Sequence, residues 1–205
     1  TRQWAQSNPN THVALVSALL QACAWLDNPD NRAETCSLLS QGRYVNAPID
    51  VLELSLTGTF HYTLDEPATA KPDFNVFHRF AANYPWRSHA IWYLSQMKRW
   101  GQDLGEYSVK DIAQSVYQPE VYRQAANKIN LKVPELDYKS EGSHTSAWCL
   151  TTQDSSIEMG ADAFMDERLF DVDSDMESID RYIDSFELKH CDSSIPLQSL
   201  VEQAV

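Results

Sequence analysis

The chain has 205 residues, of which 43% are hydrophobic, 22% charged and 11% aromatic, a composition typical of a folded globular protein. Its formal net charge is -13, and most of the excess acidic residues lie after Thr151. An acidic chain lacks the lysines and arginines that displace counterions from nucleic acid, so we expect no nucleic-acid partner. No apolar run approaches the length of about 18 residues that indicates a membrane-spanning helix.

Helices account for most of the predicted elements. Apolar residues at helical spacing predict a first helix over 11–26, which follows the Asn8-Pro9 breaker and contains a buried Cys23. Capping residues, prolines and glycines predict further helices at about 31–39, 47–56, 89–100, 108–116, from 119 onward, and 174–185. In the helix at 47–56 we expect four buried side chains, those of Val51, Leu52, Leu54 and Leu56.

Strands are few and short. Residues 59–64 alternate weakly and predict one short strand, and 148–152 predicts another, while 66–73 and 134–146 read as loops. No βαβ unit with apolar strands is visible, so the expected fold class is mainly α with a few short strands. We expect a helical portion over 1–189 and an acidic, polar C-terminal tail over 190–205.

Motifs of enzymes and of cofactor sites are missing. The six glycines form neither a dinucleotide-binding nor a P-loop pattern, and no nucleophile elbow or zinc-protease motif occurs. We therefore expect no enzyme, no cofactor and no metal. The acidic run Asp171, Asp173 and Asp175 resembles the start of a calcium loop, but Met176 and Tyr182 stand where such a loop needs Gly and Glu. The run is better interpreted as a solvated loop before a helix.

Basic and aromatic residues concentrate between Phe77 and Trp100. Ser88 is the predicted N-cap of the helix at 89–100, and Arg87 precedes it. Backbone N–H groups and a guanidinium could converge there on a small anion. Trp86, Arg87 and His89 are therefore the candidate ligand-binding residues.

The same segment also has a structural interpretation, which stays open. Trp86, Trp92, Met97 and Trp100 would then form a core stripe, and Arg87 and Arg99 would pair with neighbouring carboxylates. His144, which follows Glu141-Gly142-Ser143, is expected to be a surface or capping histidine.

The segment ANYPWRSHAIWYLSQMKRWG (82–101) resembles the corresponding stretch of the nitrate- and bicarbonate-binding proteins of ABC transporters, a family that also includes cytoplasmic nitrate sensors. Its flanks agree in order: NPNTHVALVSALLQACAWLDNPDNR (8–32), QGRYVNAPIDVL (41–52), QPEVYRQAA (118–126), DYKSEGSH (137–144) and FMDERLFDVD (164–173). The likeness covers about 8–188. The chain departs from the family after Phe170-Asp171, where Val172 stands in place of the usual Pro.

The resemblance implies that the chain is the C-terminal portion of an α/β type II periplasmic-binding-protein fold. It also implies that most anion-contacting residues lie upstream of Thr1, in the N-terminal remainder of the same protein. The implied partners are a small anion (nitrate, nitrite or bicarbonate) and an ABC permease or a regulatory protein. The implied location is the periplasm or the outer face of the membrane.

Several alternatives stay open. A cytoplasmic nitrate sensor would bind an antiterminator regulator, and a domain fused behind a transporter ATPase would have a P-loop upstream. An enzyme on the same fold, such as a thiamine-pyrimidine synthase, would need a reactive His, and the Pro-Trp-Arg-Ser-His segment argues against it. A free-standing helical interaction module would be favoured if the chain were a whole gene product.

Overall fold

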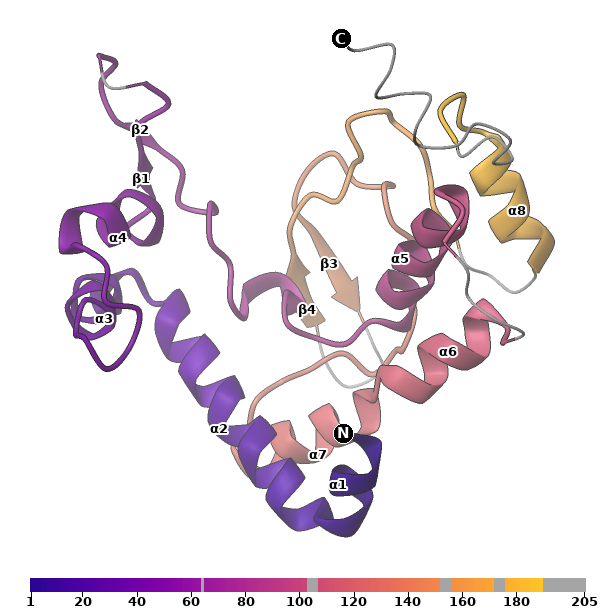
Figure 1. Ribbon diagram of the computed structural model, residues 1–205, viewed down its shortest axis with the longest axis horizontal. Helices are drawn as coiled ribbons and strands as arrows, with labels where there is room; N and C mark the ends of the chain where they lie inside the picture. The colour runs from indigo at the N-terminus through magenta and orange to yellow at the C-terminus, as the bar shows by residue number, and fades with distance from the viewer. Residues whose placement is uncertain (64, 103–106, 152–155, 172–175, 190–205) are drawn as a thin grey trace, which may run out of the picture. The chain divides into compact units, whose positions relative to one another are not determined.

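The computed structural model describes residues 1–63, 65–102, 107–151, 156–171 and 176–189 (Figure 1). The chain forms two compact units. Unit 1 comprises Thr1–Tyr84, Pro119–Glu135 and Ala147–Gly160, and unit 2 comprises Pro85–Gln118, Leu136–Ser146 and the remainder from Ala161. The predicted tail over 190–205 lies outside the described residues, so the boundary at 189 stays a prediction.

Unit 1 contains five α-helices among its described residues: α1 (Arg2–Ser7), α2 (Pro9–Asp27), α3 (Arg32–Leu39), α4 (Ile49–Leu56) and α7 (Pro119–Lys128). Two 3-10 turns, η1 (Pro29–Asn31) and η2 (Arg79–Ala81), join the longer elements. Its strands form two antiparallel ribbons, β1 (Thr59–Phe60) with β2 (Thr69–Ala70), and β3 (Trp148–Thr151) with β4 (Ser156–Met159). A mainly helical fold with a few short strands is confirmed.

Helices α2 and α7 lie side by side and form the core of unit 1 (Figure 1). Val13, Ser17 and Leu20 are buried along α2, at the spacing that places residues on one helix face. On α7, Ala125 and Ala126 are fully buried, and the Ser17 hydroxyl donates to the backbone carbonyl oxygens of Val13 and of Ala125, at 3.0 Å each. Small side chains therefore let the two helices approach closely.

Unit 2 is built from α5 (Arg87–Arg99), α6 (Val109–Val116) and α8 (Met176–Asp184), with irregular segments packed against them. The buried core joins all three helices and Phe170: Ala90, Ile91, Val109, Ala113, Phe170, Ile179 and Ile183. The indole N–H of Trp92 donates to the hydroxyl of Tyr182 at 3.0 Å, which ties α5 to α8. The run that resembled a calcium loop falls partly on 172–175, outside the described residues.

The strand predictions are partly correct. β1 covers only two residues of the predicted 59–64, and its partner β2 lies within the segment predicted as a loop. β3 confirms the predicted strand at 148–152 as far as Thr151, where the described residues end, whereas β4 was not predicted. Such short strands form only where a partner strand supplies backbone hydrogen bonds. The sequence of one strand does not show which segment will pair with it.

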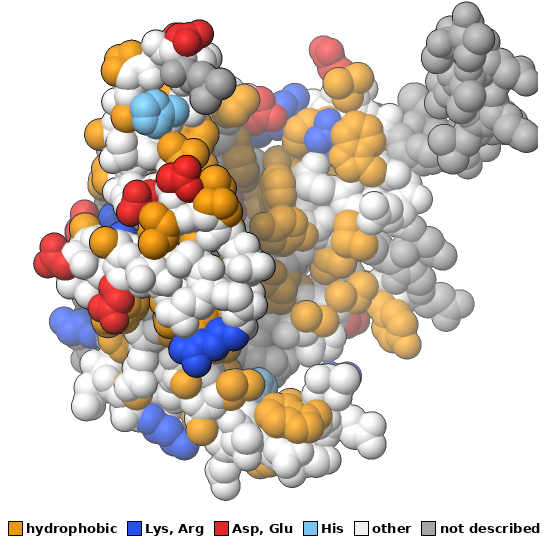
Figure 2. Space-filling view, turned by 60° about the vertical axis from the view of Figure 1, so that its left-hand side comes forward, with side chains coloured by type: hydrophobic (Ala, Val, Ile, Leu, Met, Phe, Trp, Pro, Cys, Tyr) orange, Lys and Arg blue, Asp and Glu red, His pale blue; other side chains and the backbone are white. Residues whose placement is uncertain are grey.

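Several burial predictions are wrong. In α4, Val51 and Leu54 are exposed and no side chain is fully buried. Cys23 is half-buried. Of the predicted core stripe, Trp86 is buried and Trp92 packs half-buried against the core of unit 2, whereas Met97 and Trp100 are exposed. Figure 2 shows hydrophobic side chains among the polar ones on the surface turned to the viewer. Helical periodicity marks an apolar face but does not say whether that face is covered.

Candidate functional site

The candidate ligand residues lie at the N-terminus of α5. The helix begins at Arg87 and Trp86 is its N-cap, so the prediction of Ser88 as N-cap is wrong by two positions. Trp86 does not cap with its side chain, which is buried at 1% exposure. Instead, the Arg87 backbone N–H donates to the carbonyl oxygen of Asp137 at 2.8 Å. A free helix N-terminus is a site for anions, but here the segment around Asp137 satisfies part of it.

Arg87 and His89 both face a carboxylate. The guanidinium of Arg87 forms an ion pair and hydrogen bond with the side chain of Asp137, and both side chains are largely buried. His89 Nε2 lies 3.1 Å from Glu141 Oε1. The pairing of Arg87 with a neighbouring carboxylate is confirmed, as the structural interpretation predicted. Direct contact of Trp86, Arg87 or His89 with an anion stays a prediction.

Glu141 is the centre of a buried polar network in unit 2. Its side chain is only 8% exposed, and Ser88, which is fully buried, donates from Oγ to Glu141 Oε1 at 3.1 Å. Lys139 Nζ contacts Oε2 of the same carboxylate and lies 3.8 Å from Asp162 Oδ2. Because each buried charge meets an opposite one, the network avoids the cost of an isolated buried ion.

His144 extends this network. Its Nδ1 lies 2.9 Å from Asp162 Oδ2, and its backbone N–H donates to Asp162 Oδ1 at 2.8 Å. The His144 carbonyl oxygen also accepts hydrogen bonds from the backbone N–H groups of Asp162 and Ala163. His144 therefore ties two segments together, consistent with the expected capping role. Within the described part of the chain, no three His, Cys, Asp or Glu side chains are arranged to hold a metal ion.

Arg99 differs from its prediction. Its Nε donates to the carbonyl oxygen of Leu188 at 2.7 Å, and its guanidinium lies 3.7 Å from the centroid of the Phe186 ring. The guanidinium of Arg168 lies 4.3 Å from the same centroid. Among the described residues, Arg99 thus pairs with a carbonyl and an aromatic ring rather than with a carboxylate, because Phe186, which follows α8, lies against it.

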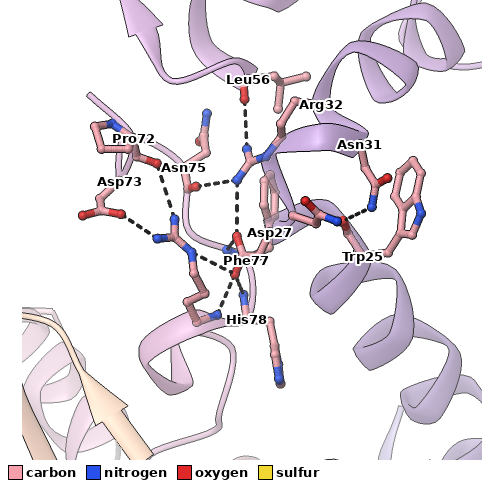
Figure 3. Close-up of polar contacts among 12 residues, drawn as sticks. Trp25, Asp27, Asn31, Arg32, Leu56, Pro72, Asp73, Asn75, Phe77 and His78 are labelled. Atoms are coloured by element: carbon pink, nitrogen blue, oxygen red, sulfur yellow. Dashed lines mark hydrogen bonds and ion pairs between the residues drawn. The ribbon is translucent and has the colours of Figure 1, made fainter. Parts of the chain in front are cut away.

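A second cluster of charges lies in unit 1, around Asp27 at the end of α2 (Figure 3). The backbone N–H groups of Phe77, His78 and Arg79 donate to its carboxylate at 3.0, 2.6 and 2.6 Å. Arg32 Nη2 lies 3.3 Å from Asp27 Oδ1, and both side chains are almost fully buried. Burial alone would raise the pKa of Asp27, but the three backbone hydrogen bonds and the nearby Arg79 outweigh it and hold the pKa below its ordinary value of 3.8.

Arg32 links three segments at this point. Besides Asp27, its guanidinium donates to the carbonyl oxygens of Leu56 at 3.1 Å and of Asn75 at 3.1 Å (Figure 3). It also lies over the Phe77 ring, 5.0 Å from the centroid. One buried ion pair therefore joins α2, α3, the end of α4 and the segment before η2.

Comparison with known proteins gives concordant results. The model of the NMT1-like family matches residues 1–40. The nitrate/nitrite binding protein NrtA of Nostoc sp. strain PCC 7120 is 27% identical over 92% of this chain and 38% of that protein. The nitrate import ATP-binding protein NrtC of Synechocystis is 32% identical over 69% of this chain and 20% of that protein. The crystal structure of the periplasmic nitrate-binding protein NrtA from Synechocystis PCC 6803 superposes with a TM-score of 0.70, at 22% identity, over 91% of this chain and 43% of the other.

These likenesses support the nitrate/nitrite and bicarbonate solute-binding family that the resemblance named. The fold of the chain is the C-terminal portion of the periplasmic-binding-protein fold, as the resemblance implied. The chain spans about two fifths of the length of the NrtA proteins it matches most fully. No described helix is long and apolar enough to span a membrane.

The Asp27 cluster was not found from the sequence as a site. From the sequence, Asp27 was interpreted only as part of the segment that ends the first helix. Arg32 was only the last residue of a segment that resembles the family. The signal that was available is the family-like string LDNPDNR (26–32), which holds both partners of the ion pair. The third contributor, the backbone at 77–79, lies about 50 positions away, and nothing in its sequence encodes an approach to a carboxylate.

Proposed function

We propose that the chain is part of a solute-binding component of an ABC transporter for nitrate, nitrite or bicarbonate. The anion is held by hydrogen bonds and ion pairs, and no covalent bond is made or broken. The observation that carries this proposal is the likeness to nitrate/nitrite binding protein NrtA of Nostoc over 92% of the chain. The likeness in fold to a periplasmic nitrate-binding protein supports it.

The role of this portion is to support the anion site rather than to supply most of its ligands. The side chains of Arg32, Arg87 and Lys139 each contact a carboxylate within the chain. A guanidinium or ammonium group that already contacts a carboxylate gains less binding free energy from a further anion than an unpaired group does. We infer that most anion ligands lie in parts of the family fold that this chain does not include.

By analogy with the periplasmic NrtA, the protein would act in the periplasm or on the outer face of the membrane and deliver its anion to a permease. The cytoplasmic-sensor alternative predicts a regulatory protein as partner instead. An exported or lipid-anchored protein would appear in the membrane or periplasmic fraction, whereas a sensor would appear in the cytosol, so fractionation separates the two.

A second candidate function is a binding domain within a transporter ATPase. It is favoured by identities of 32–34% to the nitrate import protein NrtC and the bicarbonate transport protein CmpC, both named as ATP-binding proteins. These likenesses cover 62–69% of this chain, whereas those to NrtA cover up to 92%. ATP binding by the whole natural protein supports this second candidate, and its absence leaves the first.

Calorimetric titration of the whole natural protein with nitrate, nitrite and bicarbonate tests the proposal. Saturable binding of at least one of the three anions, at a ratio of one per protein, is expected. Absence of binding to all three overturns it, and the anion that binds most tightly identifies the transported solute.

A further inference from the structure

Unit 1 contains a cavity of about 130 Å³ beside η2. It is lined by His78, Arg79, Phe80, Ala81, Tyr122, Lys132, Val133, Pro134 and Ile157, which come from η2, α7, the segment after α7, and β4. The lining holds three side chains that can carry positive charge and no carboxylate. The polar groups of this cavity therefore suit an anion.

Two of these three side chains form no side-chain hydrogen bond or ion pair within the described part of the chain. His78 Nδ1 is buried without a hydrogen-bond partner, and Figure 3 shows its ring turned away from the Asp27 carboxylate that its backbone N–H contacts. Lys132 is exposed, and it forms no ion pair or hydrogen bond among the described residues. A buried polar atom without a partner costs free energy, and a ligand atom placed there would recover it.

The other polar side chains of the lining are occupied. Arg79 Nη1 donates to Asp73 at 2.8 Å and Nη2 to the carbonyl oxygen of Pro72 at 3.4 Å. Its buried Nε has no hydrogen-bond partner but lies 3.8 Å from the Asp27 carboxylate, so the guanidinium is committed to these two carboxylates. The Tyr122 hydroxyl donates to Asn83 Oδ1 at 2.7 Å, and burial raises the pKa of Tyr122 well above its ordinary value, so it stays neutral. The groups left to bind a ligand are thus the imidazole of His78 and the ammonium of Lys132.

The backbone beside the cavity is strained. Phe80 and Ala81 have φ values of 59° and 51°, which are uncommon for residues with side chains. Gly160 lets the Phe80 ring lie against β4, because a Cβ at Gly160 would come within 3.2 Å of it. Strain of this kind persists where surrounding contacts impose it, and it concentrates at binding sites.

Size and polarity indicate which anion fits. An engineered cavity of about 150 Å³ holds benzene. A bare oxyanion such as nitrate would fill only part of this space and would leave the apolar walls formed by Val133, Pro134 and Ile157 uncovered. We propose that this cavity binds a small monocarboxylate with a compact apolar body, with its carboxylate at His78 and Lys132, in addition to the anion of the proposed transport function.

The test uses benzoate as the probe and the 205-residue chain, with amide chemical shifts as the readout. Saturable shifts confined to the backbone amides of 78–81, 132, 133 and 157 are expected, with a dissociation constant on the order of millimolar. Lys132→Ala should weaken binding about tenfold. Lys128→Ala, an exposed lysine on α7 outside the cavity lining, is the matched control and should bind as the unmodified chain does.

Ile157→Phe places bulk in the cavity and should abolish the shifts, provided that the spectrum keeps its native dispersion. His78→Phe, which removes the imidazole but keeps a ring, is the second variant and should also weaken binding. The proposal is overturned if benzoate produces no saturable shift, if Lys132→Ala and His78→Phe both bind like the unmodified chain, or if nitrate and benzoate shift these amides equally.

Discussion

Arg32 and Asp27 form an ion pair of 3.3 Å in which both side chains are almost fully buried. The pair lies where α2 ends and α3 begins, and the same carboxylate accepts three backbone hydrogen bonds from 77–79. Its geometry resembles the way a helix terminus or a backbone nest holds a free anion, but the anion here is a side chain of the chain itself. The pair therefore acts as an internal clamp of unit 1.

Asp27→Asn should strongly destabilise the chain. The substitution leaves the Arg32 guanidinium buried without its counter-charge, and breaking such a pair costs about 3–5 kcal/mol. The measurement is the free energy of unfolding in urea, followed by circular dichroism. Asp30→Asn, at an exposed acidic position three residues away, is the control and should change stability by less than about 0.5 kcal/mol. Equal losses in the two variants would contradict the clamp.

The stability of unit 1 should fall in acid through Asp27. Because folding lowers its pKa, the carboxylate stabilises the fold fully above the ordinary value of 3.8 and loses this contribution as the pH falls toward the folded-state pKa. The pH dependence of unfolding should thus be steeper below about pH 4 in the unmodified chain than in Asp27→Asn. Parallel curves for the two proteins would show that Asp27 titrates normally in the fold.

Gly142→Ala should disrupt unit 2. Gly142 has a φ of 90°, and an added Cβ would lie 2.3 Å from the Arg168 carbonyl oxygen. The neighbouring residue Glu141 exchanges two backbone hydrogen bonds with Phe170, so the displacement reaches the core. We expect a loss of more than about 2 kcal/mol in the free energy of unfolding.

Gly42→Ala is the matched control for that substitution. A Cβ at Gly42 would meet its nearest neighbour at an ordinary 3.6 Å, and its backbone is outside the left-handed region. Its stability should be unchanged or slightly raised. If the two alanine variants melt at the same temperature, the close packing around Gly142 is not as described.

The fold and the site were predictable to different degrees. Helix positions such as α2 and α7 follow from periodicity and, for α7, from the proline that opens it, which are local signals. The start of α2 was predicted two residues late, because Pro9 was interpreted as a breaker and is instead the first residue of the helix. The exposure of Val51 and Leu54 could not be predicted, because coverage of an apolar face depends on distant parts of the fold. The same limit applies to Asp27, whose partners at 77–79 are about 50 positions away.

At the N-terminus of α5, the residue types showed that a polar site was present, but the sequence did not show which groups pair with one another. The sequence marked Trp86, Arg87 and His89 as unusual. The structure pairs Arg87 with Asp137 and His89 with Glu141, and it buries Trp86. The sequence left both the structural and the anion-binding interpretation open, because basic side chains can pair with a carboxylate of the same chain as well as with a free anion.

Arg87 and Asp137 should be energetically coupled. A double-mutant cycle of Arg87→Met and Asp137→Asn separates the two interpretations, because a structural ion pair gives a coupling of about 0.5–3 kcal/mol in unfolding. The anion affinity of the whole natural protein should change little in Arg87→Met if the pair is only structural. A loss of affinity of about tenfold or more, without coupling in stability, would instead place Arg87 on the anion.

Thermal unfolding with and without saturating nitrate, nitrite or bicarbonate tests the central claim most directly, when the whole natural protein is compared with the 205-residue chain. The account predicts that at least one anion stabilises the whole protein, by about 2.7 kcal/mol at a hundredfold excess over its dissociation constant, and leaves the 205-residue chain unchanged. If none of the three anions stabilises the whole protein, the assignment to anion binding is contradicted. If the 205-residue chain is stabilised as strongly as the whole protein, the supporting role given to this portion is contradicted.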